Sequence, residues 1–275
     1  MRVSVNILKH NGNALHTCRA FARGIELSGD EAVLRTERDH RMDDFDAAVL
    51  WGYVTPCQNI VKACRDKRIP FVFMDLGYFR RTESGYFKVT VNERHPTAYL
   101  MDTKLPFDRF ERLKLNIRPW QRNGEHILLA GMSGKAAWSW KLEAESYERE
   151  AVRILKKYTK RCIIYRPKPS WPDARPIKHA NMIRGTALEQ ALENAHCVVA
   201  HHSNVACEAL LAGVPVFCKY GAASLFNSGE LSQVETPLYP DGREQWAANL
   251  AYSQWNLHEM ASGECWRHLK SVGLI

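Results

Sequence analysis

Short apolar runs rich in β-branched residues alternate with longer stretches of helical periodicity along the whole chain. Polar turns containing Gly, Asn or Pro separate these stretches from one another. The predicted strands are residues 2–8, 32–34, 47–51, 70–74, 85–92, 126–130, 162–165, 197–200 and 214–217. The predicted helices are residues 14–27, 58–68, 143–158, 188–194 and 205–212. This order of elements indicates an α/β protein with parallel sheets.

A charged, proline-containing stretch interrupts the alternation between residues 105 and 125. We therefore predict two Rossmann-like domains, residues 1–122 and 123–275, whose parallel sheets face a cleft. The tail carries Trp246, Trp255 and Trp266 on helical segments, and we expect these helices to pack back on the domains.

The 275-residue chain is 45% hydrophobic and 25% charged, which is typical of a globular protein. No apolar stretch approaches the roughly eighteen residues of a membrane span, and the N-terminal segment lacks a small-residue cleavage site. The eight cysteines form no CxxC pair, which predicts free thiols in a reducing compartment and no structural zinc. These features favour a cytoplasmic protein (host cytoplasm if a phage encodes it) without membrane insertion.

The segment from His196 to Phe217 holds the most informative pattern. A buried strand ends in His201, His202, Ser203 and Asn204, a helix follows, and Gly213 precedes the next strand. We expect Ser203 or Asn204 to cap the helix. In such a βαβ unit the helix start faces the carboxyl edge of the sheet, where a nucleotide diphosphate would bind. The pattern also fits a crossover unit without a ligand.

Two further strand exits carry residues suited to phosphate, and all three exits converge if their strands are neighbours. Glycines permit close backbone approach, and Lys and Arg supply positive charge. The predicted donor-binding residues at these exits are Gly131, Ser133, Gly134, Lys135, Arg166, Lys168, His202, Ser203 and Asn204. The sequence GMSGK is not a P-loop, because two residues separate its glycines and Ala136 follows the lysine.

Glu208 lies one helical turn beyond Asn204, on the side that faces the ligand edge. We predict that it accepts bonds from ribose hydroxyls. The alternative is a helix-surface Glu paired with a Lys.

The second half resembles the GT-B glycosyltransferases in Gly131 to Lys135, in Arg166, and above all in the sequence HHSNVACEALLAGVPVF. Within that group, DLGYF, GYFKVTVN and WAANLAYSQW look similar to small phage-type enzymes, which include those that add sugars to hydroxymethylated DNA bases. The resemblance implies transfer from a nucleotide-diphosphate sugar, most simply a UDP-sugar, to a hydroxyl. The Lys and Arg side chains present can neutralise the diphosphate, so the transfer does not require a metal ion. Binding of Mg²⁺ is compatible with these side chains.

Such a transfer needs a base that takes the proton of the acceptor hydroxyl. Asp75, at the end of an apolar strand, is the first candidate, and His10, in the turn after the first strand, is the second. Asp75 would alternatively serve as a structural turn cap.

The net charge of +8 and the pI near 9.1 favour a polyanionic partner. Together with this charge, the resemblance to phage-type enzymes implies double-stranded DNA carrying 5-hydroxymethylcytosine or a related base as the acceptor. Aromatic and basic side chains in the first half could stack on a flipped base and hold its phosphates, although the same aromatics fit a hairpin core. The predicted acceptor-binding residues are Asn13, Tyr53, Tyr78, Arg80, Arg81 and Lys88.

Three alternatives stay open at the level of sequence. The acceptor could be a glycan or a lipid-linked sugar, or the protein could bind nucleic acid without turnover. A nucleotide-sugar epimerase would need a second acid/base pair facing the sugar. The sequence does not predict an oligomeric state.

Overall fold

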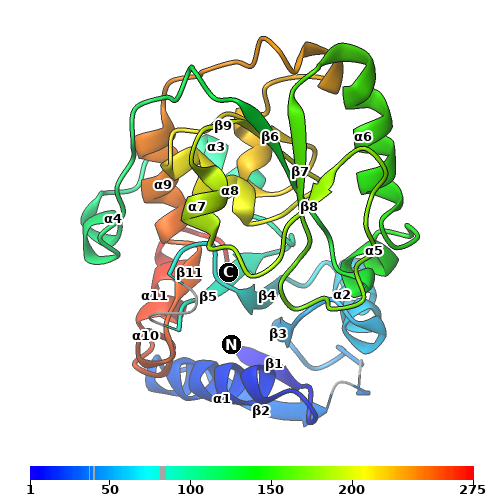
Figure 1. Ribbon diagram of the computed structural model, residues 1–275. Helices are drawn as coiled ribbons and strands as arrows, with labels where there is room; N and C mark the ends of the chain where they lie inside the picture. Colours follow the sequence, from blue (N-terminus) through cyan, green and yellow to red (C-terminus); the bar gives the residue numbers. More distant parts are fainter. Residues whose placement is uncertain (37, 40, 81–84) are drawn as a thin grey trace. The chain divides into compact units, whose positions relative to one another are not determined.

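The computed structural model describes residues 1–36, 38–39, 41–80 and 85–275. Its contacts divide the chain into two compact units, which Figure 1 shows coloured along the sequence. The first unit is Met1–Pro96 with Leu250–Ile275, and the second is Thr97–Asn249.

The first unit contains a six-stranded sheet with the strand order β11-β5-β4-β3-β1-β2. Its strands are β1 (Arg2–Ile7), β2 (Glu31–Thr36), β3 (Ala47–Trp51), β4 (Phe71–Leu76), β5 (Phe87–Val91) and β11 (Gln254–Trp255). Its helices are α1 (Gly12–Leu27), α2 (Thr55–Lys67), α10 (Leu257–Ala261) and α11 (Glu264–Ser271), and α9 (Arg243–Ala251) leads into it.

Apolar residues on the two faces of this sheet build two separate cores. On one face, Val3, Val5 and Val49 pack with apolar residues of α1, α10 and α11. On the other face, Ala48 and Leu50 pack with apolar residues of α2. Both faces of β3 and β4 are therefore covered, which is why these two strands contain continuous apolar runs.

The first sheet departs from the predicted parallel arrangement at one edge. β1 to β4 are parallel, but β5 pairs antiparallel with β4, and β11 pairs antiparallel with β5. Only residues 77–86 separate β4 from β5. A parallel crossover needs about a dozen residues or more, so this short connection returns the chain antiparallel.

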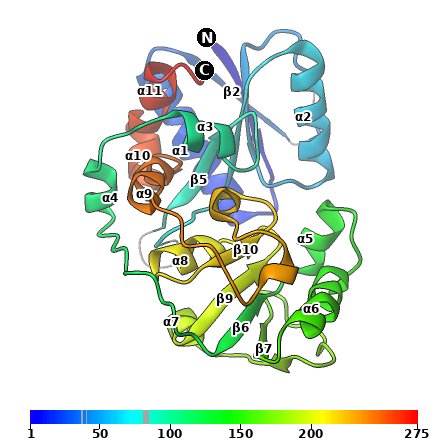
Figure 2. The same ribbon diagram turned by 90° about the horizontal axis from the view of Figure 1, so that it is seen from above.

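The C-terminal tail belongs to the first unit, whereas we predicted a division after residue 122 with the tail in the second domain. β11 extends the first sheet, and α10 and α11 lie beside α1 (Figure 2). Residues 97–122 group with the second unit, where Arg118 N–H donates to the Leu211 carbonyl and Gln121 N–H to the Gly213 carbonyl.

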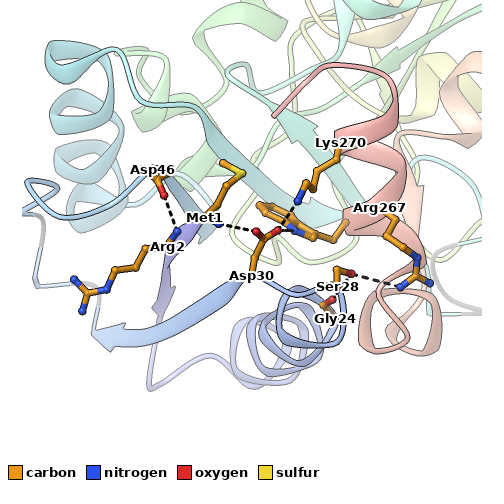
Figure 3. Close-up of polar contacts among 9 residues, drawn as sticks. Met1, Arg2, Gly24, Ser28, Asp30, Asp46, Arg267 and Lys270 are labelled. Atoms are coloured by element: carbon orange, nitrogen blue, oxygen red, sulfur yellow. Dashed lines mark hydrogen bonds and ion pairs between the residues drawn. The ribbon is translucent and has the colours of Figure 1, made fainter.

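A buried carboxylate joins the start of β2 to α11, as Figure 3 shows. Asp30 accepts hydrogen bonds from Trp266 Nε1 at 2.7 Å and from Lys270 Nζ at 2.8 Å, and the Met1 ammonium lies 2.6 Å from its Oδ1. Burial alone would raise the pKa of Asp30, but these donors outweigh it and hold the pKa well below its ordinary value.

We expect Asp30→Asn to lower the free energy of unfolding by about 2 kcal/mol at pH 7, because hydrogen bonds to a charged group are lost. A depressed pKa gives stability that is present above the unfolded-state value and is lost as the pH falls toward the native value, so the difference between the variant and the wild type should begin to shrink below about pH 4 and keep shrinking as the pH falls further. Urea unfolding at several pH values measures this difference. Glu31→Gln removes an exposed ion pair with Arg2 and should cost less than about 0.5 kcal/mol; equal costs for the two variants would contradict the role of Asp30.

The second unit contains a five-stranded, all-parallel sheet with the order β10-β9-β6-β7-β8. Its strands are β6 (His126–Ala130), β7 (Cys162–Arg166), β8 (Asn181–Met182), β9 (Ala195–Ala200) and β10 (Val216–Cys218). Its helices are α3 (Thr97–Asp102), α4 (Asp108–Arg112), α5 (Gly134–Ser139), α6 (Ser146–Tyr158), α7 (Leu188–Leu192) and α8 (Val205–Leu211), with short 3₁₀ helices η1 (Ala222–Phe226) and η2 (Leu231–Gln233). The α/β fold class with two sheets is confirmed. Among the described residues, no helix combines the length and apolar character needed to cross a membrane.

Candidate functional site

The carboxyl ends of four parallel strands lie level with one another in the second unit. Ala130 of β6 pairs with Arg166 of β7 on one side and with Ala200 of β9 on the other. Ala200 in turn pairs with Cys218 of β10. The predicted convergence of the three strand exits is therefore confirmed, and the predicted βαβ unit is formed by β9, α8 and β10.

The β6 exit is a tight turn that leaves no space for a Cβ atom at its two glycines. Gly131 N–H donates to the Arg166 carbonyl at 2.9 Å. A Cβ on Gly131 would lie 2.8 Å from Cε2 of Tyr165, and a Cβ on Gly134 would lie 2.4 Å from Cζ2 of Trp171. Ser133 follows in the turn and caps α5 by accepting the Ala136 N–H at 3.2 Å.

Positive charge gathers at the β6 and β7 exits. Arg166 is half-buried and donates from Nη2 to the Thr186 carbonyl at 3.2 Å, which orients its guanidinium group. Lys135, at the start of α5, and Lys168, two residues after Arg166, are exposed. A fixed guanidinium with two exposed ammonium groups matches the charge of a phosphate or diphosphate.

At the β9 exit, the two histidines bond to each other. His201 Nδ1 and His202 Nδ1 are 2.8 Å apart, so one nitrogen carries the proton and the other accepts it. At least one of the two imidazoles is therefore neutral. His201 is buried, whereas His202 is half-buried.

The predicted cap of α8 is supplied by serine. Ser203 Oγ accepts the Val205 N–H at 3.3 Å. Asn204 occupies the N-cap position, but its side chain makes no capping bond. Glu208 is half-buried on α8, one turn further on.

Three aromatic rings that the sequence analysis did not select surround His201. The ring centroids of Trp140, Tyr147 and Tyr220 lie 4.8, 5.1 and 4.9 Å from that of His201. Trp140 and Tyr220 also stack on each other at 4.7 Å. The sequence carried no signal for this cluster, because the three rings come from separate segments.

Of the two predicted bases, Asp75 lies within β4 and is half-buried. Its Oδ1 accepts the Leu76 N–H at 2.8 Å, and its charge acts on the guanidinium of Arg94. His10 is exposed in the turn before α1, and the predicted acceptor residue Asn13 is exposed in the first turn of that helix.

The predicted acceptor residues around the β4–β5 connection are largely core residues. Tyr78 is fully buried, and Lys88 is 5% exposed with its Nζ 4.9 Å from the Phe73 ring centroid. Tyr78 and Lys88 are therefore withdrawn from the acceptor set, because neither can reach an acceptor from inside the core. Tyr53 is half-buried beneath the guanidinium of Arg94, Arg80 is exposed, and Arg81 lies outside the described residues.

No group of three or more metal-binding side chains of the His, Cys, Asp and Glu type occurs in the part of the chain that the structure describes.

No family model matches the sequence, and no curated protein matches it. Among solved structures, a Thermosulfurimonas dismutans KpsC beta Kdo 2,4 transferase matches with a TM-score of 0.57 and 14% identity, over 91% of this chain and 90% of that chain. A beta Kdo 2,7 transferase of the same KpsC matches with a TM-score of 0.54 and 15% identity, over 91% of this chain and 89% of that chain. At these identities the likeness shows the fold, which is that of GT-B glycosyltransferases. Neither description mentions DNA.

Proposed function

We propose that this chain is a glycosyltransferase that binds a nucleotide-activated sugar at the carboxyl edge of the second sheet. The observation that carries the proposal is the level alignment of Ala130, Arg166 and Ala200. This alignment brings the glycine turn, a fixed cation and the His202–Ser203 segment to one edge, which is the usual ligand edge of a parallel sheet.

Each exit then supplies one part of diphosphate recognition. Gly131 and Gly134 allow the backbone to approach, and Ser133 and Ser203 offer hydroxyl groups. Arg166, Lys135 and Lys168 neutralise the phosphates and stabilise the leaving diphosphate as the glycosidic bond forms. Glu208 accepts bonds from the ribose hydroxyls, with a UDP-sugar as the expected donor.

For the acceptor, we favour a carbohydrate hydroxyl over a DNA base. A base-flipping enzyme needs accessible rings to hold the extruded base, and Tyr78, Tyr86 and Phe87 are buried. The two solved structures with the same fold are described as transferases of the sugar Kdo, which supports a carbohydrate acceptor. The net charge of +8 still favours a polyanion, so hydroxymethylated DNA is the second candidate.

Asp75 is the proposed general base, and Asp75→Asn is expected to lower the transfer rate at least tenfold while donor affinity stays within about twofold of wild type. Asparagine keeps an oxygen for the Leu76 N–H, so the local fold should persist. The rate of acceptor-dependent UDP release measures the effect. His10→Gln is the companion variant: loss of transfer in His10→Gln with normal transfer in Asp75→Asn would assign the base to His10.

Calorimetric titration with nucleotides and nucleotide sugars tests the donor half of the proposal. We expect micromolar binding of one nucleoside diphosphate and its sugar conjugates, with phosphate alone binding weakly. Conversion of a bound nucleotide sugar to an isomer without any acceptor would instead indicate an epimerase. A folded protein that binds none of the nucleotides would contradict the proposal.

A further inference from the structure

A buried carboxylate lies behind the β6 exit turn, outside the set of predicted donor residues. Glu148, in the first turn of α6, is 0% exposed, and its Oε1 accepts the Met132 N–H at 2.6 Å. Met132 lies between Gly131 and Ser133, so this bond fixes the centre of the turn.

Burial at this place imposes a desolvation cost on the carboxylate. Burial raises the pKa of Glu148, while the bond from Met132 opposes the rise. Glu148 Oε2 and the hydroxyl of the neighbouring, fully buried Tyr165 have no hydrogen-bond partner among the described residues. An apolar side chain of similar size would avoid the desolvation cost of Oε2, but it would leave the Met132 N–H without its acceptor.

The first turn of α6 contacts two of the strand exits at once. Glu148 holds the β6 exit through Met132, and the adjacent Tyr147 packs its ring edge-on against His201 at the β9 exit. Tyr165, below Gly131, completes the support: its hydroxyl would lie 3.1 Å from a Cβ at position 131. The backbone of the glycine turn is therefore held by Glu148 and packed against Tyr165.

We propose that Glu148 is a positioning residue for donor binding, which holds the Gly131–Ser133 backbone in the conformation that receives the donor phosphates. This inference rests on the proposed function. Glu148 does not touch the donor itself; its carboxylate fixes the Met132 amide, and through it the directions of the neighbouring amide and of the Ser133 hydroxyl. Its contribution appears in the order of the turn and in donor affinity.

The test compares Glu148→Leu, Glu148→Gln and Glu150→Gln by amide hydrogen exchange, urea unfolding and UDP titration. Glu148→Leu should speed exchange of the turn amides at 131–133 at least tenfold and weaken UDP binding at least tenfold, while urea unfolding shows that the variant remains folded. Glu148→Gln keeps an oxygen for Met132 and should stay within about threefold of wild type in both. Glu150, on the exposed side of the same helix in an ion pair with Arg153, is the matched control and should change neither.

Each outcome decides the matter. Wild-type UDP affinity in Glu148→Leu overturns the proposal. Loss of UDP binding in Glu148→Gln with intact protection of the turn amides also overturns it, because that result assigns the effect to the charge of Glu148 and not to its bond with Met132. If Glu148→Leu does not fold, the role of Glu148 is structural and the proposal is overturned. If the wild type does not bind UDP, the donor assignment fails separately, and hydrogen exchange in Glu148→Leu still shows whether Glu148 orders the turn.

Discussion

Replacing Arg166 with alanine is expected to reduce sugar transfer about 100-fold or more, the largest loss among the variants considered. Arg166 lies at the end of β7, where the hydrogen bond from its guanidinium to the Thr186 carbonyl fixes its position. A preorganised charge stabilises the developing negative charge on the leaving phosphate without reorganisation, and removal of one such group typically costs 10²–10³ in rate. Both donor affinity and kcat should fall.

The control for Arg166→Ala is Lys160→Ala. Lys160 is an exposed cation just before the amino end of β7, at the opposite edge of the sheet. Initial rates of nucleotide release at saturating acceptor measure both variants. Equal rates for the two variants would remove Arg166 from the phosphate site.

Gly24→Ala is expected to lower the free energy of unfolding by about 3 kcal/mol or more. Gly24 lies in α1, labelled in Figure 3, where the tail passes very close. A Cβ there would lie 1.9 Å from the Met260 carbonyl oxygen and 3.0 Å from the Gly263 Cα, both backbone atoms that cannot rotate away. Alanine favours helix by about 1 kcal/mol over glycine, so any destabilisation comes from the lost docking of α10 and α11.

Gly12→Ala, at the start of the same helix, provides the matched control, because nothing lies within 4 Å of a Cβ at that position. Its stability should equal or slightly exceed that of wild type. Urea unfolding measures both variants. A Gly24→Ala protein as stable as Gly12→Ala would show that close packing of the tail on α1 does not support the first unit.

Much of this architecture could be predicted from local pattern. Central strands such as β3 and β6 are buried on both faces, and their continuous apolar runs give their bounds correctly. The βαβ unit was predictable because strand, turn, helix and glycine stop follow one another within His196 to Phe217. Convergence of the β6, β7 and β9 exits was predictable only on the condition that the strands are neighbours, which a single sequence does not show.

Features that depend on distant partners could not be predicted. The pairing of β11 with β5 joins Trp255 to Phe87, and no local signal encodes it. The aromatic residues Tyr78 and Tyr86 fit either an exposed surface on which a base stacks or a protein core, because the sequence does not show which residues pack over them. Glu148 looked like any charged helix residue, since its bond to Met132 spans sixteen positions and one intervening helix.

The most direct test of the central claim is an acceptor-dependent transfer assay, in which the protein is incubated with a panel of nucleotide sugars and with either carbohydrate acceptors or hydroxymethylated and unmodified duplex DNA. Mass spectrometry of the acceptors and of the nucleotide pool reads out the reaction. We predict that one nucleotide sugar is consumed and that a carbohydrate acceptor gains the mass of one sugar residue, with Arg166→Ala strongly impaired. A mass gain on hydroxymethylated DNA alone would support the transferase activity but identify DNA as the acceptor. If the folded protein consumed none of the nucleotide sugars, that result would contradict the account.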